Sequence, residues 1–158
     1  MKIRDLLSEI PYQQHKVWPL EVEKLLNTDI DIMSDWGRAE SLISQAIGQF
    51  PESVELKVAY YKMLAYSNRL EEAMSVIQDV LKKTESGLDA LPANIGEMEE
   101  TSRVHLYTLK ALAFVSLKME NITAAQKVLD HLEQLDPSDQ VGASVVRDLA
   151  NSFAEAAE

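Results

Sequence analysis

The chain has 158 residues, a length that fits one domain able to bury about two thirds of its unfolded surface. Its hydrophobic content of 46%, with only five glycines and five prolines, excludes a disordered protein and favours ordered helix. The formal net charge of −11 opposes binding to nucleic acid or to anionic membranes, because both require a positive surface. We therefore expect neither as a partner.

The absence of cysteine excludes disulfides, thiolate zinc sites and cysteine nucleophiles. The first ten residues carry charges throughout and do not resemble a secretory signal. The longest largely apolar run, 111–117, is far shorter than the roughly 20 residues of a membrane-spanning helix. We expect a cytoplasmic protein.

Residues 1–18 begin with a short amphipathic helical pattern that ends at Pro11, and a polar piece, 12–17, follows. We expect this segment to dock as an N-terminal cap. Pro19 suits the first turn of the next helix, because its missing N–H costs nothing there. A break near 27–31 is expected because these residues favour helix poorly. The apolar residues of the two patterns are Ile3, Leu6, Leu7 and Ile10, then Val22, Leu25, Leu26, Ile30 and Met33.

The stretch 36–51 sets the pattern for the rest of the chain. Ala39, Ile43 and Ala46 share one face of a predicted helix, and Pro51 lies just beyond its last turn. A second helix is predicted from Val54 to about Ala65, and a turn at 67–68. The first pattern then returns, with Ala73 in the place of Ala39 after 73 − 39 = 34 residues, which is the tetratricopeptide period.

The pattern is interrupted by residues 84–101, which contain Gly87, Pro92 and Gly96 and are predicted to be an inserted loop. A strongly apolar helix follows over 104–119, with a turn at 120–121 and a third copy of the pattern up to Pro137. Ser138 or Asp139 could cap a last helix. We expect one apolar stripe on that helix (Val141, Val145, Leu149, Phe153) and a solvated face (Arg147, Asp148, Glu155, Glu158).

These patterns resemble the tetratricopeptide repeat family. The signature of its second helix occurs three times, as Ala39/Ile43/Ala46/Pro51, Ala73/Ile77/Val80 without a proline, and Ala125/Leu129/Leu132/Pro137. Trp36 aligns with Leu70 and Ile122 as the residue that seats each of these helices. A plain helical bundle with alanine-rich stripes is the alternative.

The resemblance implies an all-α fold, a right-handed α-solenoid of about three helix-turn-helix repeats in a single domain. The expected divisions are an N-terminal cap (1–18), repeat 1 (19–51), repeat 2 (54–83), an inserted loop (84–101), repeat 3 (102–137) and a capping helix (138–158).

In this family the first helix of each repeat lines the concave face, so the resemblance also indicates where a partner would bind. It assigns five residues to that face: Lys62, Tyr66, Tyr107, Lys110 and Phe114. We expect a non-catalytic adaptor that binds a peptide or partner segment there, with the aromatic side chains supplying contact area and the lysines orienting a carboxylate. Phe114 and Leu117 could instead belong to the core.

Two specific functions within the family, and one function from outside it, also need to be considered. The family's carboxylate clamp is not supported, because Ala59 and Tyr107 stand where polar residues are expected. A weaker resemblance, in size, charge and layout, is to the small acidic tetratricopeptide chaperones of bacterial secretion systems, which implies a secreted client. The alternative from another class is a helical-bundle enzyme with His105 or His131 as acid or base.

No metal or cofactor motif is recognisable. The three histidines (His15, His105, His131) lack a second ligand at helical spacing, and the acidic run 29–35 lacks the glycine and closing glutamate of a calcium loop. A homodimer and a monomer are both compatible with the sequence.

Overall fold

The computed structural model describes residues 1–11 and 16–157, and every regular element in these ranges is helical. No helix there combines the length and apolar character that crossing a membrane requires. The chain forms two compact units, Met1–Val76 and Ile77–Glu158, and the boundary between them falls within one helix. Each unit is described by itself.

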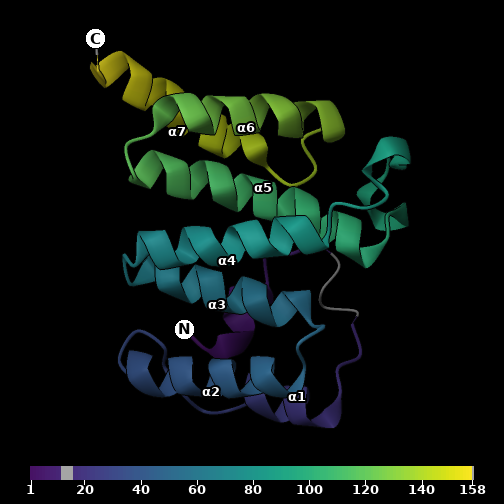
Figure 1. The fold of residues 1–158 in the computed structure, drawn as a ribbon, viewed down its shortest axis with the longest axis vertical. Helices are drawn as coiled ribbons and strands as arrows, with labels where there is room; N and C mark the ends of the chain where they lie inside the picture. Colours follow the sequence, from purple (N-terminus) through teal and green to yellow (C-terminus); the bar gives the residue numbers. More distant parts are fainter. Residues whose placement is uncertain (12–15, 158) are drawn as a thin grey trace. The chain divides into compact units, whose positions relative to one another are not determined.

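Unit 1 is built around a long helix, α3, which packs against α2 and against the N-terminal segment (Figure 1). The helix α1 contacts both α2 and that same segment. The elements are η1 (Ile3–Leu7, a 3-10 helix), α1 (Leu20–Leu26), α2 (Trp36–Gln49), α3 (Val54–Tyr66) and the first half of α4 (Leu70–Lys83).

The expected N-terminal pattern is confirmed as a buried apolar face, although the helix is a short 3-10 turn. Residues 12–15 of the predicted polar piece lie outside the described residues. Pro19 is the N-cap of α1, which ends at Leu26, so the predicted break is also confirmed. Beyond it the helical spacing no longer applies: Met33 is exposed and Ile32 is buried in its place.

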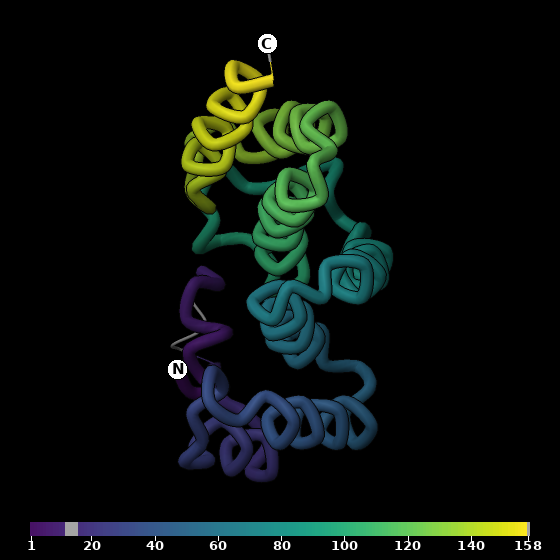
Figure 2. The backbone as a smooth tube through the Cα atoms, turned by 90° about the vertical axis from the view of Figure 1, so that its left-hand side faces the viewer, coloured from purple at the N-terminus to yellow at the C-terminus, as the bar shows by residue number. Residues whose placement is uncertain are grey.

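Unit 2 is a three-helix arrangement in which α5 packs against α6 and α7, and α6 packs against α7 (Figure 2). Its core is formed by apolar side chains from all three helices and from the segment that precedes α5. The elements are the second half of α4, η3 (Leu88–Ala90), η4 (Ile95–Glu97), α5 (Glu100–Lys118), α6 (Ile122–Leu135) and α7 (Ala143–Ala157).

Three helices share one local structure. The helices α2, α4 and α6 each have 14 residues, and each buries its fourth, eighth and eleventh side chains. Their first residues are Trp36, Leu70 and Ile122, all half-buried. Phe50 and Asp136, which follow α2 and α6, leave the helix at nearly equal backbone angles, because the next residue is proline in both cases.

The turns after α3 and α5 are also alike. Asn68 and Glu120 both have a positive φ, of 62° and 64°. The next N–H in each turn, of Arg69 or Asn121, donates to a carbonyl five residues back, at 2.9 Å in both cases. This is the Schellman geometry that ends a helix and satisfies its last carbonyls. The predicted turns at 67–68 and 120–121 are therefore confirmed.

The predicted insertion, 84–101, is ordered, and it contributes to the core of unit 2. Two 3-10 turns interrupt it, and α5 begins at Glu100 within the predicted loop. Ile95 and Met98 are each 5% exposed and pack among α5, α6 and α7 side chains. The side chain of Gln140 accepts from the Ile95 N–H at 2.8 Å and donates to the Ala93 carbonyl at 2.7 Å.

The last helix differs from the expectation. Its buried residues are Ala143, Val146 and Ala150, whereas Val145 and Phe153, expected in the buried stripe, are exposed. Ala143, Val146 and Ala150 share the face that packs against α5 and α6, so Val145 and Phe153 lie outside that face. Asp139 accepts from the Ser144 N–H at 3.2 Å, in line with its expected capping role.

The expected solvated face of this helix is also only partly observed. Arg147 is not free in solvent but forms ion pairs with Asp130 at 2.6 Å and Glu133 at 2.9 Å, which join α7 to α6. Asp148 and Glu155 are exposed as expected, and Glu158 lies outside the described residues.

The positive φ of Glu120 gives a first test. A left-handed conformation costs a residue with a Cβ about 1 kcal/mol, and glycine adopts it without that cost. We expect Glu120→Gly to raise the free energy of unfolding by about 0.5–1 kcal/mol, measured by urea unfolding. Asn68→Gly is the matched control and should change it less, because asparagine tolerates this conformation. A destabilised Glu120→Gly variant would contradict the turn geometry.

Candidate functional site

The candidate site of unit 1 lies on α3, which presents Lys62 and Tyr66. Lys62 is 8% exposed, and its Nζ lies 3.4 Å from Oε2 of Glu9, a residue of the N-terminal segment. Tyr66 is 46% exposed, one turn further along the helix. Partial burial, and secondarily the charge of Glu9, raise the pKa of Tyr66. The expected binding face of α3 is thus occupied in part by the chain's own N-terminal segment.

The candidate site of unit 2 lies on α5, where Lys110, Phe114 and Lys118 follow one another at intervals of four. Phe114 is 39% exposed, which places it on the surface, whereas Leu117 is in the core. The Nζ of Lys118 lies 5.8 Å from the centre of the Phe114 ring, a cation–π distance. Tyr107, also expected on this face, is only 5% exposed.

Lys110 extends from α5 toward the start of α7. Its Nζ lies 3.4 Å from the position that a Cβ would occupy at Gly142, whose φ is +78°. Gly142 therefore provides both the left-handed backbone and the space beside this ammonium group. Lys110 is half-buried. The contact places a positive charge at the junction of α5 and the α6–α7 loop.

The residues of the repeat signature are structural. Every alanine, isoleucine and leucine of the signature is buried, and the two prolines follow directly on the residues that end α2 and α6. The buried set is Ala39, Ile43, Ala46, Ala73, Ile77, Ala125 and Leu129, and the prolines are Pro51 and Pro137. None of the buried members can contact a partner directly.

The sequence did not identify three surface features that the structure shows. Lys118 stacks near Phe114, and Val145 and Phe153 of α7 are 70% and 38% exposed. The spacing of Phe114 and Lys118 by four residues could have suggested the first. The exposure of Val145 and Phe153 depends on which face of α7 meets α5 and α6, and periodicity alone cannot supply that.

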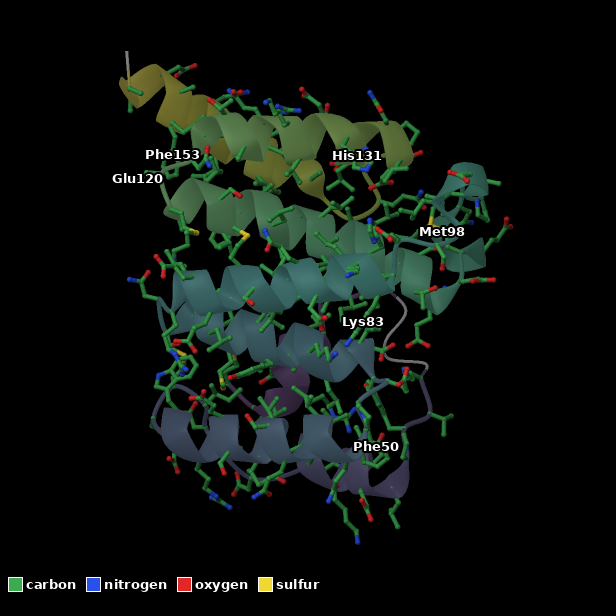
Figure 3. The ribbon with its side chains drawn as sticks, viewed as in Figure 1. Phe50, Lys83, Met98, Glu120, His131 and Phe153 are labelled. Carbon is green, nitrogen blue, oxygen red and sulfur yellow. The ribbon has the colours of Figure 1, made fainter. Side chains whose placement is uncertain are left out.

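The histidines of the enzyme hypothesis have different environments. His105 on α5 is 5% exposed, and its Nδ1 lies 2.9 Å from Oγ1 of Thr84. The Thr84 hydroxyl lies 2.7 Å from the Val80 carbonyl, which can only accept a hydrogen bond. We therefore assign the Nδ1–H tautomer to His105, donating to the hydroxyl. His131 on α6 is exposed (Figure 3).

Burial lowers the pKa of His105, and the charge of His131 lowers it further. Glu85 and the Leu81 carbonyl oppose this effect. His105 is thus held in its neutral form. It contacts the Thr84 hydroxyl, which already donates its own hydrogen to the Val80 carbonyl. Within residues 1–11 and 16–157, no three His, Asp or Glu side chains are grouped as metal ligands would be.

Comparisons of the chain with protein-family models, with curated proteins and with solved structures find no match. The tetratricopeptide resemblance therefore depends on the sequence pattern and on the local structure described above.

The environment of His105 predicts a pH dependence of stability. The unfolded chain binds a proton at this residue near pH 6.5, and the folded chain binds it only at lower pH. The unfolded state therefore holds more protons in that interval, and the free energy of unfolding should fall as pH falls below about 6.5. Urea unfolding at several pH values between 7.5 and 5.5 measures this fall in the free energy of unfolding.

His105→Gln should reduce this pH dependence, whereas His131→Gln, at an exposed residue, should leave most of it. An unchanged slope in His105→Gln would show that the buried imidazole is not responsible.

Proposed function

We propose that the chain is a non-catalytic protein-interaction module, a right-handed α-solenoid of the tetratricopeptide type that binds partner segments on the α3 and α5 helices. The recurrence of three 14-residue helices with equivalent buried positions supports this architecture. The two matching Schellman turns support it as well, because repeat proteins reuse one connection between the helices of each unit.

The observation that carries the binding proposal is the surface of α5. It exposes an aromatic ring, Phe114, between two lysines, on a protein whose net charge is −11. Exposed aromatic side chains are enriched at binding hot spots, and flanking cations select acidic partners. The face formed by Lys110, Phe114 and Lys118 therefore fits a segment that combines apolar and acidic residues.

A helix that packs against α5 also exposes apolar side chains. The helices α5 and α7 pack against each other in unit 2, and α7 exposes Val145 and Phe153. Several large apolar side chains are thus exposed on two adjacent helices.

A site-specific photocrosslink tests the proposal. A photoreactive phenylalanine at 114 should capture a partner in extracts of the producing cells, and the same residue at Lys127, exposed on α6, should not. Lys110→Glu combined with Lys118→Glu should reduce capture at least about tenfold, the effect of losing roughly 1.4 kcal/mol of binding energy. Lys127→Glu is the matched charge control. Equal capture from both positions, or capture insensitive to the double variant, would reject the α5 surface.

A further inference from the structure

The N-terminal segment 3–10 fills one face of unit 1. Its four apolar side chains, Ile3, Leu6, Leu7 and Ile10, are each between 0% and 4% exposed. The segment contacts α3 and α1, and Figure 2 shows it beside both. On the receiving helix, Val58 is fully buried and Lys62 is nearly so. Lys62 belongs to the helix face on which the tetratricopeptide resemblance places partner binding.

Polar contacts fix the segment at its rim. Glu9 pairs with Lys62, although Glu9 itself is 62% exposed on its side chain. Arg4 donates to Glu23 of α1 at 2.7 Å and to Asn27, which follows α1, at 3.0 Å. The docked segment is therefore recognised by two kinds of contact. Apolar side chains at i, i+3, i+4 and i+7 enter the face, and an acid at i+6 meets a lysine.

We propose that this face of α1 and α3 is a binding site for short helical segments of that pattern, and that residues 3–10 occupy it until a partner displaces them. This inference rests on the proposed function, because it names the chemistry of the partner for the α3 site. The partner segment is amphipathic and carries a carboxylate one residue before its last apolar anchor.

The docked segment has the properties of a replaceable ligand. Its helix is a five-residue 3-10 turn, too short to be stable without the surface beneath it. The ion pair of Arg4 with Glu23 is largely exposed and contributes little to stability. In the pair with Lys62, the partner that belongs to the segment, Glu9, is 62% exposed on its side chain. Attachment through the chain keeps it at an effective concentration of about millimolar, so an external segment must bind with higher intrinsic affinity or be abundant.

Amide hydrogen exchange of the unmodified protein gives the first test. The N–H groups of Asp5, Ser8 and Ile10 bond only to carbonyls within the N-terminal segment. They should exchange at least about tenfold faster than the amides in the middle of α3, because the segment opens while the rest of unit 1 stays folded. Equal protection in both places would show that the segment is a permanent part of the core and would overturn the proposal.

Peptide binding gives the second test. A blocked, fluorescent peptide of residues 1–11 should bind Leu6→Asp, whose own segment is weakened, at least tenfold more tightly than wild type. In wild type, excess peptide should accelerate exchange at Asp5, Ser8 and Ile10. A peptide of the same composition with its apolar residues moved out of register should do neither. Binding without accelerated exchange would place the peptide elsewhere and overturn displacement.

The acidic position is tested by a charge pair. In the Leu6→Asp background, Lys62→Met should weaken the peptide several-fold, and it should have little effect on a peptide carrying Glu9→Gln. Lys24→Met, at an exposed lysine of α1, is the matched control. Equal losses for both peptides would remove the carboxylate from the recognition pattern. All these measurements use only this chain and synthetic peptides, so failure to capture a cellular partner would count against the proposed function alone.

Discussion

The constraint on which the rest of the structure depends is an alanine at the fourth position of α2, α4 and α6. Each of these side chains is completely buried. A methyl group is small enough for helix backbones to approach closely, as α2 does to α3 and α6 to α5. Any larger side chain would push the pair apart, at a typical cost of about 1–3 kcal/mol. The exposed positions of the facing helices, including those on α5, are set by these contacts.

The helices α3 and α5 have different surroundings within their own units. On α3 of unit 1, the face that carries Lys62 is covered by a segment of the same chain and the lysine has an acidic neighbour in Glu9. On α5 of unit 2, the Phe114 ring and Lys118 are exposed, and Lys110 is half-buried. In both cases the chemistry is the same, since apolar contact is combined with a cation in an otherwise acidic protein.

The helices and their turns could be predicted where local signals decide them. The pattern of Ala39 and Ile43 specified a helix face, and the prolines after α2 and α6 specified its end. Contacts between distant segments could not be predicted in this way. The burial of Lys62 depends on residues more than fifty positions earlier, and the exposure of Val145 depends on how α7 meets α5 and α6. For the same reason the repeat pattern predicted which helices carry the candidate site. It did not predict which side chains of those helices the fold leaves accessible.

The contact of Gln140 with the insertion has a consequence for the order in which the chain folds. Its two hydrogen bonds connect residues 45 and 47 positions apart, across the whole of α5 and α6. Closing so long a loop costs entropy that is repaid only once the intervening helices have packed. During synthesis, Ile95 leaves the ribosome well before its acceptor does. The insertion can therefore acquire its final structure only late, after the α6–α7 loop has formed.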